Sequence, residues 1–279
     1  MRIVVTNDDG IDSVGMHLLA QALATRLSEF EPEVIVIAPD TEYSGAGASV
    51  GALHLIRPEV HRVHTDSMPA VTQAWTVSGP PALCMMFMRL GAFGPPADLV
   101  VSGINPGANV GRAVYHSGTV GAALTARNGG ISAVAISQDV AAGSYDGQGL
   151  ESMLAQQVWA GAVDVTVEVV RGLLTSPAGY PVALNVNTPN CQAAAMKGWR
   201  QTEIGMVPPR TLGSAVLEPK PGHEGAFRVA MSWGEPNTIP EHLDGGAVAS
   251  GYVSISDLSR ITAAPTPHGV QDALNTMFG

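Results

Sequence analysis

Short apolar segments rich in valine and isoleucine alternate with segments of helical periodicity over most of this chain. The apolar segments are RIVVT (2–6), EVIVIA (33–38), DLVVS (98–102), SAVAIS (132–137) and PVALNV (181–186). The helical patterns cover residues 15–27, 80–90, 119–127 and 151–174. Nearly continuous apolar strands are typical of a sheet that is buried on both faces. The alternation therefore predicts an α/β fold: a mostly parallel, doubly wound sheet with helices on both faces and right-handed crossovers.

The composition of the sequence changes after Pro189, where glycine and proline become frequent. Isolated strand patterns follow at residues 198–204, 227–233 and 251–258. We interpret residues 1–190 as the core and residues 191–279 as an extension of hairpins with a final strand or helix, both within one domain. The glycine-rich segment 143–149 is interpreted as a surface loop or flap.

Charge and cysteine content exclude several classes of protein. The chain of 279 residues carries 14 basic and 24 acidic side chains, a net charge of −10, so it should repel nucleic-acid polymers. Its two cysteines, Cys84 and Cys191, form no CxxC pair, which argues against a disulfide framework or a thiolate zinc site. No apolar run approaches the roughly 20 residues of a membrane span, and we expect a cytoplasmic protein.

Polar side chains gather just after the predicted strands, where ligands bind in parallel α/β sheets. Asp8 and Asp9 follow the first strand, Ser44 follows the second, and Asn105 follows the third. Carboxylate, hydroxyl and carboxamide oxygens form a hard ligand set that favours Mg²⁺, Mn²⁺ or Ca²⁺ over zinc. A divalent cation would also let two adjacent carboxylates stay ionised together. The competing interpretation is that Asp-Asp-Gly is an ordinary turn.

The segment SGTVGAALTA (117–126) has the pattern of a helix start. Ser117 or Thr119 can cap this helix, and Gly118 permits a close approach to the backbone. Free N–H groups and the helix dipole make such an end a ready phosphate site. The alternative is that Ser117 only caps its own helix. His116, which precedes the turn, could protonate a leaving alkoxide, although a packing or rim role is the simpler interpretation.

Other phosphate and nucleotide motifs fail when they are tested against the sequence. A P-loop needs Gly-Lys, and neither Lys197 nor Lys220 follows a glycine. The segment GAGASV has Val50 in place of the third glycine of a dinucleotide fingerprint, and it follows the second strand instead of the first. Gly10 stands where an aspartyl-phosphate phosphatase of the haloacid dehalogenase type would need a second aspartate. These classes are disfavoured.

Several motifs, taken in order, resemble the stationary-phase survival protein family, SurE. They are TNDDGID, APDTEYSGAGAS, DLVVSGINPGANVG, SGTVGAA, LNVNTPN and GYVSISDL. The resemblance implies a three-layer Rossmann-like phosphatase that acts on nucleoside 5′- and 3′-monophosphates. It also implies a dimer or tetramer whose C-terminal extension is exchanged between subunits. One departure is the turn DTEY before Ser44, where basic or amide side chains are commoner in the family, and this leaves substrate preference open.

The resemblance assigns site residues by position. The divalent ion, Mg²⁺ or Mn²⁺ with Ca²⁺ as a substitute in crystals, would be held by Asp8, Asp9, Ser44 and Asn105. The residues expected near the phosphate or the rest of the substrate are Asn7, Gly45, Asn109, His116, Ser117, Gly118 and Thr119. Asp8 or Asp9 would act as the catalytic base or, alternatively, as the nucleophile. A second hypothesis is a regulatory module that binds a nucleotide or phosphate without turning it over.

Overall fold

A large mixed sheet forms the centre of the molecule. The structure is a computed structural model that describes residues 1–64, 66–140, 150–259 and 265–278. Within these residues, a nine-stranded sheet has the order β3-β4-β2-β1-β5-β6-β7-β11-β8. Its strands are β1 (Arg2–Thr6), β2 (Glu33–Pro39), β3 (Val60–Val63), β4 (Gln73–Val77), β5 (Leu99–Pro106), β6 (Ser132–Gln138), β7 (Ala183–Thr188), β8 (Trp199–Gln201) and β11 (Val253–Asp257).

The central strands are parallel, as the sequence predicts. β1 lies between β2 and β5, with Ile3 opposite Val34 on one side and Leu99 on the other. Antiparallel pairs occur towards the edges, where β3 joins β4 and β11 joins β7. The carboxyl ends of β2, β1 and β5 consequently lie side by side at one rim of the sheet.

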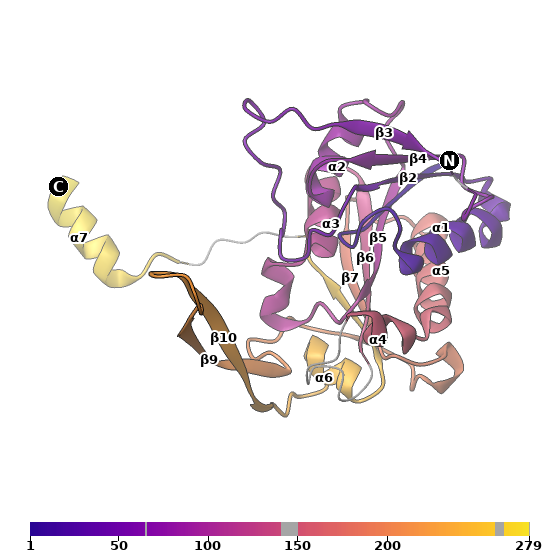
Figure 1. Cartoon of the computed structure of the whole chain (residues 1–279). Helices are drawn as coiled ribbons and strands as arrows, with labels where there is room; N and C mark the ends of the chain where they lie inside the picture. The colour runs from indigo at the N-terminus through magenta and orange to yellow at the C-terminus, as the bar shows by residue number, and fades with distance from the viewer. Residues whose placement is uncertain (65, 141–149, 260–264, 279) are drawn as a thin grey trace.

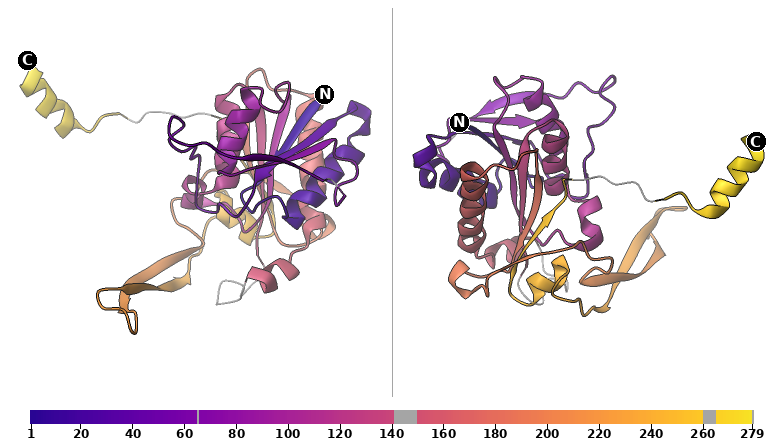
Figure 2. Two further views of the ribbon diagram at one scale, coloured as in Figure 1. Left: turned by 45° about the horizontal axis from the view of Figure 1, so that its top comes forward. Right: turned by 180° about the vertical axis from the view of Figure 1, so that it is seen from behind.

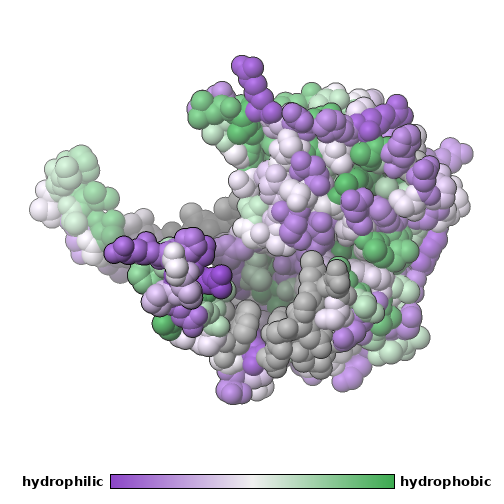
Figure 3. Space-filling model, in the orientation of Figure 1, coloured by the Kyte–Doolittle hydropathy of each residue, from purple (hydrophilic) through white to green (hydrophobic). Residues whose placement is uncertain are grey.

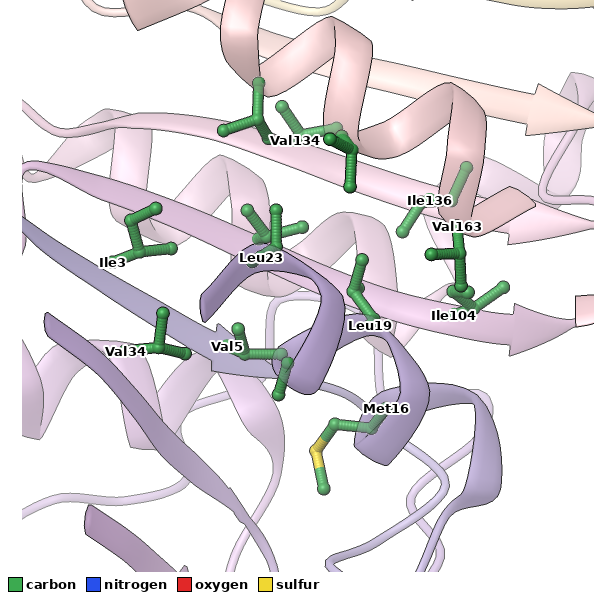
Figure 4. Packing of buried hydrophobic residues seen from close by; sticks show 14 of the residues in the cluster. Ile3, Val5, Met16, Leu19, Leu23, Val34, Ile104, Val134, Ile136 and Val163 are labelled. Atoms are coloured by element: carbon green, nitrogen blue, oxygen red, sulfur yellow. The ribbon is translucent and has the colours of Figure 1, made fainter. Parts of the chain in front are cut away.

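Helices cover both faces of the sheet and give the three layers of a Rossmann-like fold (Figures 1 and 2). α1 (Val14–Arg26) and α5 (Trp159–Thr175) pack on one face, while α2 (Pro81–Arg89) and α3 (Gly118–Asn128) pack on the other. Alternation along β1 places Ile3 and Val5 in the first core and Val4 in the second. Figure 4 shows Ile3 and Val5 among the side chains of the first core, near Leu19 and Leu23 of α1.

The single helix predicted over 151–174 is wrong, because the chain forms two helices there. α4 (Leu150–Ala155) ends before α5 begins at Trp159. Asn190 stabilises the break, since its Oδ1 accepts from Val158 N at 2.8 Å and its Nδ2 donates to the Gln156 carbonyl at 3.1 Å. The flap expected at 143–149 lies outside the described residues.

The C-terminal part divides between the main sheet and two projecting elements. β8 and β11 extend the sheet beyond β7, and the short helix α6 (Asp244–Ala249) precedes β11. In contrast, the hairpin of β9 (Arg210–Pro219) and β10 (Phe227–Pro236) projects from the body, as does α7 (His268–Phe278) (Figures 1 and 2). None of the helices in the described part of the chain is long and apolar enough to cross a membrane.

Candidate active site

A cavity of about 380 Å³ opens at the carboxyl ends of β1, β2 and β5. It is lined by Asp8, Asp9, Glu42, Ser44, Gly45, Asn105, Pro106, Asn109, Ala113, His116, Ser117 and Met153. The four residues expected to hold a metal ion, Asp8, Asp9, Ser44 and Asn105, all line this one cavity. The topology brings them together because β1 lies between β2 and β5 in the sheet.

Asp8 is buried and is held by the start of α3. Its Oδ1 accepts a hydrogen bond from Thr119 Oγ1 at 2.5 Å. Gly118 allows this contact, because a Cβ on that residue would lie 2.7 Å from Asp8 Cβ and 2.8 Å from Asp8 Oδ2. Burial raises the pKa of Asp8, and the hydrogen bond from Thr119 opposes that rise. The positive end of the α3 dipole therefore meets a carboxylate of the chain itself.

Asp9 stands beside Asp8 and has a carboxylate oxygen that has no partner in the described part of the chain. Its Oδ2 is buried and makes no hydrogen bond to the described residues. Burial, followed by the negative charges of Asp8 and Glu42, raises the pKa of Asp9 to about 8. At neutral pH the Asp9 carboxyl of the metal-free site thus keeps its proton, which a divalent cation would displace on binding.

The donor set fits a hard divalent cation. The unpartnered Asp9 Oδ2 offers a ligand atom, and Ser44 adds a hydroxyl at the same cavity. Asn105 Nδ2 donates to the Gly107 carbonyl at 2.6 Å, which leaves Asn105 Oδ1 as the amide atom available to a ligand. Within the described residues, no group of three histidine, cysteine, aspartate or glutamate side chains could hold a metal. The set therefore consists of two carboxylates completed by neutral oxygens, the composition that favours Mg²⁺ or Mn²⁺ over zinc.

The residues expected near the phosphate fall into two groups. Gly45, Asn109, His116 and Ser117 line the cavity, and Ser117 also caps α3 by accepting from Val120 N at 3.0 Å. The other group, Asn7, Gly118 and Thr119, is absent from the described cavity lining. Thr119 and Gly118 contact Asp8 instead, and Asn7 is buried with its Nδ2 donating to the Gly10 carbonyl at 2.9 Å.

A buried network fixes Asn109. Its backbone N–H donates to Asn187 Oδ1 at 2.7 Å, and its Nδ2 donates to Ser137 Oγ at 2.8 Å. Its carbonyl accepts from Asn185 Nδ2 at 2.9 Å and from Asn187 Nδ2 at 3.2 Å. The side chains at the ends of β6 and β7 therefore hold this part of the cavity wall in one position.

Two acidic residues that shape the site were not predicted from the sequence. Glu42 lines the cavity as a third acidic residue, with its Oε1 accepting from Ser44 N at 2.5 Å. The turn DTEY, which departs from the family pattern, could have indicated this acidic residue. The second is Asp244 at the start of α6, which is buried and accepts from Gly111 N at 2.7 Å and Gly205 N at 3.0 Å. It fastens the C-terminal part to the 3₁₀ helix Gly111–Tyr115, which leads into His116 and Ser117.

The fold and the cavity together define a Rossmann-like α/β protein with an acidic, oxygen-lined site at the carboxyl rim of its sheet. Residues 3–210 match the family model of the survival protein SurE, and the chain belongs to that family. This confirms the resemblance drawn from the motifs.

Individual relatives agree with this assignment over nine-tenths or more of the chain. The chain is 32% identical to the 5′-nucleotidase SurE of Marinomonas sp. (strain MWYL1) over 260 residues, covering 92% of this chain and 91% of that protein. It is 32% identical to the 5′-nucleotidase SurE of Haemophilus influenzae (strain PittGG), covering 100% of this chain and 99% of the relative. The crystal structure of the SurE protein from Aquifex aeolicus superimposes with a TM-score of 0.73 at 27% identity, covering 99% of both chains.

Proposed function

We propose that this chain is a metal-dependent phosphomonoesterase that hydrolyses nucleoside 5′-monophosphates, and also 3′-monophosphates, to nucleoside and phosphate. The observation that carries the proposal is the pair Asp8 and Asp9 at one cavity, both with raised pKa values and with Asp9 Oδ2 unpartnered among the described residues. The relatives named as 5′-nucleotidases supply the substrate class.

One divalent ion per subunit, Mg²⁺ or Mn²⁺, would be held by Asp8, Asp9, Ser44 and Asn105. When bound, it supplies positive charge that keeps both carboxylates ionised and polarises a phosphoryl oxygen. Such charge is needed because none of the described residues lining the cavity is a lysine or an arginine.

The protein's own groups then position the substrate and move protons. Asp9 is the better candidate for the base, because Asp8 Oδ1 already accepts a hydrogen bond from Thr119. Asp9 would hold the ion through Oδ2 and accept the proton on its other carboxylate oxygen, Oδ1. Asp9 accepts a proton from the attacking water as the new oxygen–phosphorus bond forms and the ester bond breaks. His116, at the cavity wall, can return a proton to the leaving alkoxide. Asn109 and Ser117 lie where they can hydrogen-bond the phosphoryl oxygens.

The C-terminal extension would join subunits into a dimer or a tetramer. On α7, Val270, Leu274, Met277 and Phe278 are exposed, and their spacing gathers them on one face. The hairpin exposes Val216, Leu217, Phe227, Val229 and Met231. Figure 3 shows apolar surface on α7, which projects from the body of the molecule. Exposed apolar patches of this kind mark interaction surfaces, and a second copy of the chain is the partner that the resemblance implies.

Phosphate release from a panel of nucleoside monophosphates, with and without a chelator, tests the proposed function. We expect release that stops on chelation and returns with Mg²⁺ or Mn²⁺. Asp9→Asn should abolish it, whereas the matched control Asp164→Asn should not, because Asp164 lies on α5 in an exposed pair with Arg26, outside the candidate site. Nucleotide binding without phosphate release would favour the regulatory module instead.

A further inference from the structure

A second cavity, of about 460 Å³, adjoins the candidate active site. It is lined by Asp9, Asp12, Ser13, Val14, Glu42, Pro106, Leu154, Ala155 and Trp159. Three of these residues, Asp9, Glu42 and Pro106, also line the active-site cavity. A molecule whose phosphate lies beside Asp9 can therefore extend directly into the second cavity.

The lining of this cavity combines apolar and polar residues. The apolar residues are Val14, Pro106, Leu154, Ala155 and Trp159, and the polar residues are Asp12, Ser13 and the two shared acids. Small-molecule sites of about 300–1,000 Å³ commonly combine apolar walls with a few polar groups. Since none of the described lining residues is basic, the cavity does not suit a second phosphate. It suits a flat, uncharged group that carries hydrogen-bond donors.

Trp159 is fixed in place as a wall of the cavity. A Cβ on Gly15 would lie 2.8 Å from Trp159 Cζ3 and 3.2 Å from Cε3, so the indole packs directly on the backbone of α1. The backbone immediately before Trp159 is held as well, because Asn190 bonds Gln156 O and Val158 N at the α4–α5 break. A ring that packs on the backbone of α1, on a chain segment that is itself held in place, is a preorganised surface for stacking, because little side-chain freedom is lost when a ligand binds.

We propose that this second cavity binds the nucleoside part of the substrate, with the base on Trp159 and the phosphate at Asp8 and Asp9. The carboxylates of Asp12 and Glu42 accept hydrogen bonds from base N–H groups or ribose hydroxyls. This inference rests on the proposed function and deepens it, since it makes Trp159 the residue that distinguishes nucleotides from other phosphomonoesters.

The test compares kcat/KM for AMP and for ribose 5-phosphate, which lacks the base. In the wild type we expect AMP to be preferred, and in Trp159→Leu the ratio of the two values should fall roughly 5- to 150-fold, the range expected for losing one aromatic stack. Trp159→Phe keeps an aromatic side chain and should restore most of the preference. Its activity would also show that the protein folds with a changed side chain at this position. Trp199→Leu is the matched control, because Trp199 is exposed on β8, outside both cavities, and the ratio should not change.

Two results would overturn the inference while leaving the proposed function intact. One is equal hydrolysis of AMP and ribose 5-phosphate by the wild type. The other is a Trp159→Leu variant that loses activity on both substrates in the same proportion, which is the signature of a structural role. If the wild type releases phosphate from neither compound, the proposed function fails. Calorimetry with AMP then decides the inference: weaker binding by Trp159→Leu than by Trp199→Leu supports it, and equal binding rejects it.

Discussion

Replacing Asp9 with asparagine should stabilise the metal-free protein while it destroys the metal site. In the folded chain the pKa of Asp9 is raised from 3.8 to about 8, first by burial and then by the charges of Asp8 and Glu42. The folded state therefore keeps a proton between these two pH values that the unfolded state has released. Since the folded state binds more protons there, the free energy of unfolding falls as the pH rises from about 4 to about 8. An asparagine side chain cannot ionise, so the variant lacks this dependence.

The size of the effect follows from the same pKa values. pH 7 lies roughly three units above the pKa of the Asp9 carboxyl in the unfolded chain, and each unit corresponds to about 1.4 kcal/mol. The loss of folding free energy at Asp9 therefore has an upper limit of about 4 kcal/mol. Structural relaxation and water entry reduce this figure. We expect the stability difference between Asp9→Asn and the wild type to grow by about 1–3 kcal/mol between pH 5 and pH 7.

Urea unfolding at several pH values, in the presence of a chelator, measures this difference. Adding Mn²⁺ should then reverse the order, because saturating metal at 100 times its Kd adds about 2.7 kcal/mol to the wild type and little to the variant. Asp164→Asn serves as the control and should follow the wild type in both conditions. A difference between Asp9→Asn and the wild type that does not change with pH, or equal stabilisation of both by Mn²⁺, would refute the reasoning.

Three further predictions concern other parts of the molecule. Gly118→Ala should lower the free energy of unfolding by about 1–3 kcal/mol and kcat at least tenfold, because the new methyl group would displace the Asp8 carboxylate. Thermal unfolding and phosphate release measure the two effects, and wild-type activity would contradict the prediction. Asp244→Ala should lower the free energy of unfolding in urea by about 3 kcal/mol, since it leaves Gly111 N and other buried donors unpaired. A loss below about 0.5 kcal/mol would contradict this prediction. Leu274→Glu should lower the assembly state in analytical ultracentrifugation, because a charge enters the apolar face of α7; an unchanged mass would exclude that face from the subunit contact.

The central strands were predictable because they are buried on both faces. β1 and β2 read as continuous apolar runs, and their bounds in the structure differ from the prediction by a residue at most. β3 was missed because it is an exposed edge strand whose sequence, VHRV, shows no apolar run. β9 was missed as well, since its sequence mixes glycine and polar residues within a projecting hairpin. The break before α5 was invisible because helical periodicity continues across it, and the side chain that stabilises it, Asn190, lies far along the chain.

The candidate site was predictable as far as strand ends determine position. The order of the parallel strands brings Asp8, Asp9, Ser44 and Asn105 to one cavity, a consequence of topology that the sequence pattern implies. Contacts that depend on side-chain direction were not available from the pattern. Thr119 bonds Asp8 across 111 residues of sequence, so the capping motif that looked like a phosphate site is partly occupied by the chain's own carboxylate.

The central claim is that oxygen atoms from three adjacent strand ends hold one divalent cation. The most direct test is the anomalous diffraction of crystals soaked in Mn²⁺. We predict a single manganese peak among the side chains of Asp8, Asp9, Ser44 and Asn105, with Asp9 Oδ2 as one of its ligands. A cavity without manganese density, or manganese bound elsewhere on the chain, would contradict the account.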